Sequence, residues 1–299
     1  DGNYDLRLDS QINIRFSSNG LNYKTEYTFD ENGNWTLYID YVWNTVTAVF
    51  VPRTKVEYTY NANGNQTFFI RYSWNTDSQS FVTSFKNEYT YNANGNQTLD
   101  IYYNWNTDSQ SFVADYKYES TYDANGNQTL VISYNWDTDS QSFVASYKNE
   151  FTYDANGNRT LSIDYNWNTD SQSFVPRYKN EYTYNANGNQ TLFIGYSWNT
   201  DSQSFVADYK YEFTYDANGN TTLYIYYNWN TDSQSFVTFY KNEYTYNANG
   251  NQTLFIGYSW NTDSQSFVPS SKFEYTYDEN GNQTLFIGYS WNTDSQSFV

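Results

Sequence analysis

The sequence predicts an all-β fold in which tandem 31-residue β-hairpin repeats form a continuous antiparallel meander that curls or spirals. Three observations predict it: a glycine motif with a constant period, two alternating runs in each period, and turn residues between the runs. A constant period of this length is typical of arrays in which each unit packs only on its neighbours.

An Asn-Gly-Asn or Asp-Gly-Asn motif marks each repeat, and every step is 31 residues. The units start near Gly2, Gly33, Gly64, Gly95, Gly126, Gly157, Gly188, Gly219, Gly250 and Gly281. No linker or shift of composition divides the chain, so we expect residues 1–299 to form a single repeat array. Residues 1–32 are a degenerate first unit, because they lack the tryptophan and the Asp-Ser-Gln-Ser turn. The chain starts in register and stops within a repeat, which favours a segment of a longer protein.

Two runs in each repeat have the alternation of half-buried strands. In the unit around Gly219, residues 205–215 alternate with period two, and Leu223, Ile225, Tyr227 and Trp229 alternate in the same way in the next run. The aromatic and β-branched residues in these runs favour strands.

The turn between the two runs sets their predicted register. Asp216-Ala217-Asn218-Gly219 is typical of a three-residue hairpin loop that closes on a left-handed glycine with a bulge. Pairing Asp216 with Asn220 then predicts that both runs contribute to one aromatic face. The expected pairs are Phe213–Leu223, Tyr211–Ile225, Tyr209–Tyr227 and Ala207–Trp229.

A second turn, residues 230–235, joins each hairpin to the next. A loop of two or four residues here pairs Trp229 with Phe236 and Ile225 with Tyr240. Pro52, Pro176 and Pro269 share one column beside this turn. Proline lacks a backbone donor, so we expect that column to need none.

The aromatic face must be covered, and a sheet of about twenty strands does not usually stay open and singly layered. The sheet could curl into a spiral or tube, pack on a second chain, or be replaced by a β-solenoid. A solenoid would place Lys179 beside Lys210, which is unfavourable, so the meander is favoured. We expect the tryptophans Trp198, Trp229 and Trp260 to be buried. The opposite face varies between copies and is a candidate contact surface, which carries Phe193, Tyr224, Phe255, Asp100, Ser162 and Arg71.

The composition excludes several classes of function. The net charge of −18 and the pI near 4.1 argue against nucleic acid and anionic membranes as partners. No apolar run is long enough for membrane insertion. The chain has no His and no Cys, so we expect no enzyme activity, no catalytic residues and no cofactor. The loop Asp154–Asn158 faintly resembles a calcium loop, but turn chemistry explains its residues and we predict no metal site.

An Asn-x-Thr sequence follows each motif glycine from Gly33 onward and is a possible N-glycosylation acceptor. The asparagines are Asn34, Asn65, Asn96, Asn127, Asn158, Asn189, Asn220, Asn251 and Asn282. The alternative, which explains both residues, is that the asparagine ends a turn and the threonine opens a strand.

The segment Tyr122–Asn127, within Thr-Tyr-Asp-Ala-Asn-Gly-Asn-Gln-Thr, resembles the YD (Rhs-like) repeat, whose core is Tyr-Asp-x-x-Gly followed by Arg or Asn. The resemblance implies a large secreted or surface protein with spiralling hairpin sheets, which sometimes form shells around a toxin. This chain departs from the pattern in its longer unit, in the Asn that often replaces Asp, and in its uniform copies. These departures count against a closed shell. The arrays also resemble secreted surface repeat proteins of the Bacteroidetes type.

We therefore expect a structural repeat segment of an extracellular fibre, stalk or filament-forming surface protein, located outside the cell or at its surface. Self-association into filaments is the expected interaction, because head-to-tail contacts need not close. One alternative is an adhesin or glycan-binding module that uses exposed aromatic residues. A second alternative is the YD-type shell of a secreted toxin.

Overall fold

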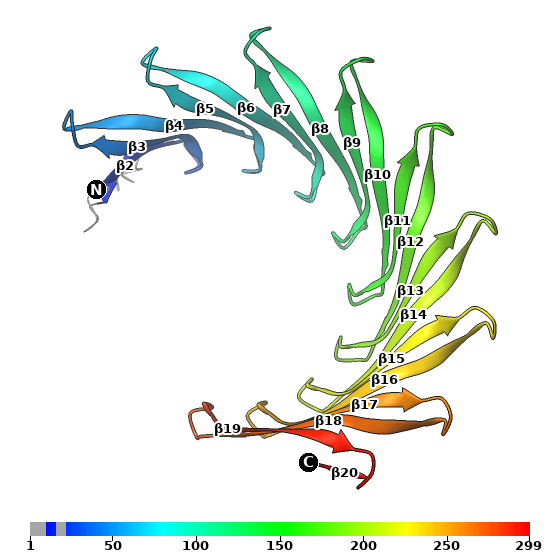
Figure 1. Cartoon of the computed structure of the whole chain (residues 1–299). Coiled ribbons are helices and arrows are strands. Elements are labelled where there is room, and N and C mark those ends of the chain that lie inside the picture. The colour runs from blue at the N-terminus through cyan, green and yellow to red at the C-terminus, as the bar shows by residue number, and fades with distance from the viewer. Residues whose placement is uncertain (1–9, 16–21) are drawn as a thin grey trace, which may run out of the picture. The chain divides into compact units, whose positions relative to one another are not determined.

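The computed structural model describes residues 10–15 and 22–299, and within these it contains only β-strands, turns and connecting segments (Figure 1). The predicted degenerate unit, residues 1–32, lies partly outside the described residues, and its Gly2 lies wholly outside them. The strands are β1 (Ser10–Arg15), β2 (Tyr23–Phe29), β3 (Trp35–Asn44), β4 (Val49–Tyr60), β5 (Gln66–Asn75), β6 (Ser80–Tyr91), β7 (Gln97–Asn106), β8 (Ser111–Tyr122), β9 (Gln128–Asp137), β10 (Ser142–Tyr153), β11 (Arg159–Asn168), β12 (Ser173–Tyr184), β13 (Gln190–Asn199), β14 (Ser204–Tyr215), β15 (Thr221–Asn230), β16 (Ser235–Tyr246), β17 (Gln252–Asn261), β18 (Ser266–Tyr277), β19 (Gln283–Asn292) and β20 (Ser297–Phe298).

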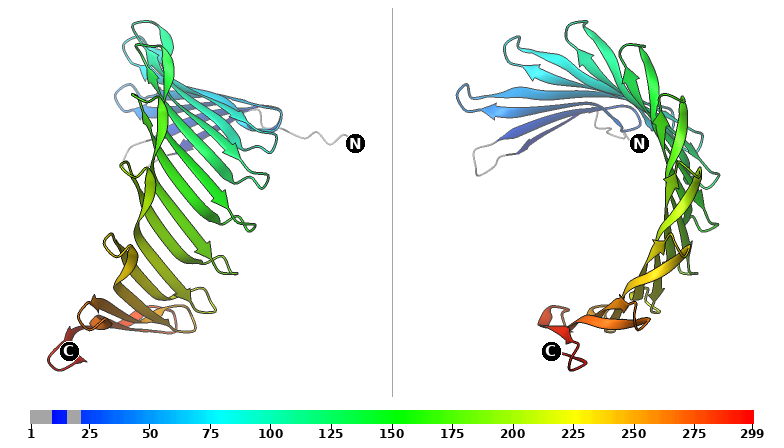
Figure 2. Two further views of the ribbon diagram at one scale, coloured as in Figure 1. Left: turned by 90° about the vertical axis from the view of Figure 1, so that its right-hand side faces the viewer. Right: turned by 45° about the vertical axis from the view of Figure 1, so that its right-hand side comes forward.

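The chain divides into two compact units, residues 1–148 and 149–299. In each unit the hairpins lie side by side in a single layer, and strands that are neighbours in the sequence pair antiparallel (Figures 1 and 2). Glu181 of β12 pairs with Ile194 of β13, and Ile194 pairs with Lys210 of β14. An intervening strand therefore separates equivalent charged residues. The predicted meander is confirmed, and the solenoid alternative is wrong.

The first turn has the predicted three-residue loop. The N–H of Asp216 donates to the carbonyl of Asn220 at 2.9 Å, and the N–H of Gly219 donates to the carbonyl of Asp216 at 3.1 Å. Gly219 has φ of +87°, a conformation that glycine adopts at little cost. The Asp216 carboxylate also accepts the N–H groups of Asn218 and Asn220, each at 2.9 Å. Short polar side chains therefore hold each turn from within.

The second turn is a four-residue loop, Thr231–Gln234, between the paired residues Asn230 and Ser235. The side-chain oxygen of Asn230 accepts the N–H of Ser233 at 2.8 Å. Gln234 ends the loop with φ of +50°, which is uncommon for a residue with a side chain. The predicted pair of Trp229 with Phe236 is confirmed.

The predicted register of the first hairpin is wrong by one residue, because β15 contains a bulge at its start. Tyr215 pairs with Thr221, but Thr214 pairs with Leu223, so Thr222 is an extra residue. Phe213 consequently faces Tyr224 and not Leu223. Two more expected pairs fail for the same reason, because Tyr211 faces Tyr226 and Tyr209 faces Asn228. The expected pair of Ala207 with Trp229 is not formed, because Ala207 lies beyond the β14–β15 pairs, which end at Tyr209 and Asn228.

A second bulge lies in the even-numbered strand after each four-residue loop. Gly195 pairs with Tyr209 and Tyr196 pairs with Ala207, so Asp208 is the extra residue in β14. The same bulge in β16 makes Ile225 face Lys241, and the expected pair of Ile225 with Tyr240 is wrong.

The proline column lies at this second bulge. Pro176 pairs with Tyr165 immediately before the register shift, as Pro52 does with Tyr41 and Pro269 with Tyr258. Bulges are among the few places in a sheet that accept proline. The ladder is therefore irregular where proline replaces the Ala or Thr of other copies.

Substitutions at the left-handed positions of the two turns are expected to change the free energy of unfolding in opposite directions. Gly219→Val places a β-branched residue at φ +87° and is expected to lower the free energy of unfolding by about 1–3 kcal/mol. Gln234→Gly removes the cost of a side chain at φ +50° and is expected to raise it by up to about 1 kcal/mol. Urea unfolding of the two variants tests this, and equal destabilisation by both would contradict the turn assignment.

Candidate functional site

The two faces of the sheet differ in chemistry, and the two bulges determine which residues share each face. One, here called the invariant face, carries the positions of Lys210, Glu212, Ile225, Tyr227 and Trp229 and their counterparts in other copies. These positions keep the same residue from the second glycine motif onward. The other, here called the variable face, carries the positions of Tyr209, Tyr211, Phe213, Tyr224 and Tyr226 and their counterparts. The sequence therefore holds one face constant and changes the other.

A lysine, a glutamate and a tyrosine form the repeating contact of the invariant face. The Lys210 ammonium lies 2.7 Å from the Glu212 carboxylate, and the Tyr227 hydroxyl donates to the same carboxylate at 2.6 Å. The ammonium also lies 3.9 Å from the centroid of the Tyr227 ring and 5.4 Å from that of Phe236. Such ion pairs and cation–π contacts stabilise modestly when partly exposed. Lys210 therefore links β14, β15 and β16, and the equivalent contact recurs in both units, as at Lys55 and Lys241.

The titration of these groups follows from their contacts. Burial raises the pKa of Glu212, but the hydrogen bonds from Lys210 and Tyr227 outweigh it, so the pKa lies below its usual value. Burial and the bond to Glu212 raise the pKa of Tyr227 far above its usual value. The carboxylate is therefore held charged and the phenol neutral.

Two further contacts tie the strands together. Trp229 packs edge-to-face on Phe236, with ring centroids 5.0 Å apart, beside the four-residue turn. The hydroxyl of Tyr215 donates to the backbone carbonyl of Gln190 at 2.7 Å, across to the preceding hairpin. This second contact joins neighbouring repeats and not only the two strands of one hairpin.

The tryptophans are not buried as the sequence predicted. Trp198, Trp229 and Trp260 are half-exposed, because the strands of each unit form a single layer. Among the described residues the only buried hydrophobic side chains are Val56 and Ile70, at 8% and 9% exposure. Cohesion therefore comes from contacts between neighbouring strands within each face.

The variable face carries the residues predicted for it. Phe193 pairs with Tyr182 and Tyr211, and Tyr224 pairs with Phe213 and Asn242. Both therefore lie on the face opposite to the leucine and isoleucine positions. Phe255, Asp100 and Ser162 occupy the same column as Phe193, and Arg71 lies on the same face in the column of Tyr226. Sequence reasoning missed that Tyr209, Tyr211 and Phe213 share this face. Their variation among copies is the signal that could have placed them there.

The variable face is uneven, because some of its columns carry an aromatic ring in one repeat and a glycine in the next. The Tyr211 ring lies 4.9 Å from that of Tyr226. In the preceding hairpin the column of Tyr226 holds Gly195, and the ring of Tyr209 covers it so closely that an added Cβ would lie 2.7 Å from the ring. An aromatic ring over a strand glycine restores contact that the glycine lacks.

Polar residues break the aromatic surface at a few places. Asn87 is 6% exposed and donates to the Asp100 carboxylate at 2.9 Å. Burial raises the pKa of Asp100. Asp208, the extra residue of the β14 bulge, adds another polar side chain to this face. Its carboxylate accepts a hydrogen bond from the Ser197 hydroxyl at 2.9 Å. These groups could orient a ligand that lies on the aromatic rings.

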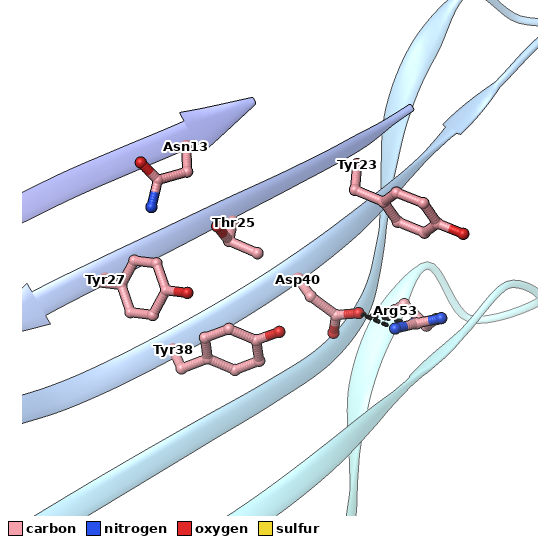
Figure 3. A pocket seen from close by; sticks show the side chains of 7 residues that line it. All are labelled: Asn13, Tyr23, Thr25, Tyr27, Tyr38, Asp40 and Arg53. Carbon is pink, nitrogen blue, oxygen red and sulfur yellow. Dashed lines mark hydrogen bonds and ion pairs between the residues drawn. The ribbon is translucent and has the colours of Figure 1, made fainter. Parts of the chain in front are cut away.

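Among the described residues, two hollows are lined mainly by side chains of the variable face, one in each unit. The first has a volume of about 290 Å³ and is lined by residues of β1 to β4, including Asp40 and Arg53 (Figure 3). The second has a volume of about 190 Å³ and is lined by Asp164, Tyr178, Asn180, Tyr196, Asp208 and Tyr209. Asp40 and Asp164 occupy the same column of the repeat.

The asparagines of the predicted glycosylation sites end the first turns. In five copies the side-chain nitrogen donates to the turn aspartate at 2.9–3.0 Å, and these are Asn34, Asn127, Asn158, Asn220 and Asn282. In the loop Asp154–Asn158 the carboxylate likewise accepts two N–H groups of its own turn. Glycan attachment at these five asparagines would require breaking the side-chain bond, and their modification stays a prediction.

The part of the chain that the structure describes holds no group of three or more acidic, His or Cys side chains placed to bind a metal ion. Nor do its described residues include a helix with the length and apolarity to cross a bilayer.

No family model and no curated protein matches the sequence, so the resemblance to the YD repeat is not confirmed by a family model. A solved protein of unknown function from Bacteroides fragilis is 19% identical over 44% of this chain and 92% of its own, with a TM-score of 0.35. A porin-like protein from Bacteroides uniformis is 10% identical over 78% of this chain and 94% of its own, with a TM-score of 0.28. A chain of TcdB2-TccC3-TEV is 11% identical over 97% of this chain and 19% of its own, with a TM-score of 0.23. At these scores the likenesses assign neither a family nor a function.

Proposed function

We propose that the chain is a structural repeat segment of a protein displayed outside the cell or at its surface. The observation that carries this is the recurrence of the same Lys–Glu–Tyr contact in successive hairpins, as at Lys55, Lys86 and Lys117. A contact that each unit repeats with the next allows the array to lengthen without new kinds of interaction. The net charge of −18 supports solubility of such an array.

Self-association into filaments is part of this proposal. Large side chains stay exposed on the single-layered sheet, among them Tyr178 at 41% and Phe239 at 56%. Burial of exposed aromatic area is a driving force for association. Electron microscopy of the purified chain at rising concentration tests it: fibres or laterally packed sheets support the proposal, and dispersed monomers at all concentrations contradict it.

A second candidate function is an adhesin whose variable face contacts a cell-surface partner. The hollows beside Asp40 and Asp164 favour it, because they combine aromatic rings with polar groups on the face that changes between copies. Polar groups placed among aromatic rings are typical of ligand sites. Adhesion of chain-coated beads to cells would test this function. The variable-face variant replaces Tyr224 and Tyr226 with serine, and the same change is made at the equivalent aromatic positions of the other repeats. Adhesion that stays unchanged in this variant counts against the adhesin function.

A third candidate function is the YD-type shell of a secreted toxin. It requires further domains that fill and close the shell. The open reading frame that surrounds this sequence tests it, and a frame that encodes only more repeats would contradict it.

A further inference from the structure

The larger hollow on the variable face is built from one row of paired residues. Asn13 of β1 pairs with Thr25 of β2, and Thr25 pairs with Asp40 of β3. Tyr27 and Tyr38 pair on one side of this row, and Tyr23 flanks it on the other (Figure 3). The ring centroids of Tyr27 and Tyr38 are 5.3 Å apart.

The floor of the hollow depends on the small side chain of Thr25. In other copies the same column carries larger residues such as Tyr118, Tyr211 and Phe273. Tyr211 packs there on its neighbours, with its ring 5.4 Å from that of Tyr224. Those three copies fill the space with an aromatic ring, whereas Thr25 leaves it open.

Asp40 has an unusual environment at the edge of the hollow. It is 5% exposed, and its Oδ2 accepts from Nε and Nη2 of Arg53 at 2.7 and 2.6 Å. Its Oδ1 is buried and has no hydrogen-bond partner. A buried acceptor without a donor costs about 1–3 kcal/mol, so a donor that reaches Oδ1 is favoured. The Arg53 side chain is 62% exposed, and it contacts Oδ2 and not Oδ1.

The charges in the hollow favour a neutral ligand. The Arg53 guanidinium already pairs with the Asp40 carboxylate, so an added cation gains little from the carboxylate and an added anion gains little from the guanidinium. The remaining wall consists of three tyrosine rings with threonine and asparagine side chains. Such a wall suits a molecule with an apolar face and several hydroxyl groups.

We propose that this hollow binds one neutral pyranose ring of a carbohydrate, stacked on Tyr27 or Tyr38, with a sugar hydroxyl donating to Asp40. Its volume of about 290 Å³ is at the lower limit of ligand pockets and fits a single sugar ring. The inference rests on the contact role proposed for the variable face and names its ligand class.

A matched pair of variants tests the site. Thr25→Tyr fills the hollow with a residue that the same column accepts elsewhere, and Asn242→Tyr makes the same kind of change in that column outside the hollow. Saturation-transfer NMR with neutral hexoses, hexose disaccharides, tetramethylammonium and inorganic phosphate measures binding to the full chain. We expect neutral sugars alone to bind, Thr25→Tyr to weaken them at least about tenfold, and Asn242→Tyr to leave binding unchanged.

A second variant keeps the test independent of folding. Asp40→Asn retains the shape of the side chain but removes the charged acceptor, and we expect about tenfold weaker binding with an unchanged circular dichroism spectrum. Sugar binding that survives both Thr25→Tyr and Asp40→Asn overturns this site and leaves the wider contact role of the variable face intact. Binding of tetramethylammonium or phosphate in preference to sugars, or of no probe at all, also overturns it.

Discussion

Raising the pH above 10 is expected to unfold the array cooperatively, because tyrosines of the invariant face must stay protonated to donate to glutamate. Burial and the bond to Glu57 raise the pKa of Tyr72 to about 12. Tyr134 is raised to about 12 in the same way by burial and Glu119. The ordinary pKa of tyrosine is near 10.0, so the unfolded chain loses its protons first.

Proton linkage gives the direction in which stability changes with pH. Stability from these tyrosines is complete below the unfolded pKa and is lost as the pH rises through the folded pKa, between about 10 and 12. Because the contact recurs in successive hairpins, we expect tyrosinate absorbance and loss of the β-sheet circular dichroism signal to rise together. Tyrosine titration centred on pH 10 with intact β-structure would contradict this account of the invariant face.

Deleting 31 residues from within a strand is expected to leave a folded, shorter array, whereas deleting 32 is not. Removal of residues 194–224 joins Phe193 to Ile225, which restores the same column order. Removal of residues 194–225 joins Phe193 to Tyr226 and moves each following side chain of the strand to the opposite face. Tyr227 would then leave the glutamate and lysine of the preceding strand.

The two deletions differ by one residue, so each serves as the control for the other. Urea unfolding and amide hydrogen exchange measure the result. We expect the 31-residue deletion to lose little stability, and the 32-residue deletion to lose about 3 kcal/mol or more in the affected hairpin. Equal protection of the strand amides in both would show that the period does not fix the faces.

The strands, both turns and the meander could be predicted from the sequence because local chemistry specifies them. Gly219 at φ +87° and the hydrogen bonds of Asp216 follow from turn preferences that need no tertiary information. The solenoid was rejected on the repulsion between Lys179 and Lys210, and the observed strand order agrees, because β13 pairs with both β12 and β14 and separates the two lysines.

The additional strand bulges at Thr222 and Asp208 could not be predicted in this way, and they decide which residues line the candidate site. Alternation along residues 221–230 continues through Thr222, so no break in the pattern marks the extra residue. The bulge places Thr222 where its hydroxyl bonds that of Thr214 at 2.9 Å, a contact between two residues ordinary in any strand. The hollow beside Asp40 was missed for a related reason, because it depends on which side chains lie opposite one another across three strands.

The central claim is that one face holds the array together while the other is free to vary. Tyr102 and Tyr103 test it most directly, because they are adjacent and identical but lie on opposite faces. Tyr102 stacks on Tyr116 at 4.9 Å in a column that elsewhere holds Ser133 or Gly195. Tyr103 donates to Glu88 at 3.2 Å and lies under the Lys86 ammonium, 4.1 Å from its ring centroid.

The decisive measurement compares Tyr102→Ser with Tyr103→Ser by hydrogen exchange of the β7 amides. We predict that Tyr103→Ser costs more local stability than Tyr102→Ser, by at least about 1 kcal/mol, because it removes a hydrogen bond and a cation–π contact together. An equal cost, or a larger cost for Tyr102→Ser, would contradict the division of the sheet into an invariant and a variable face.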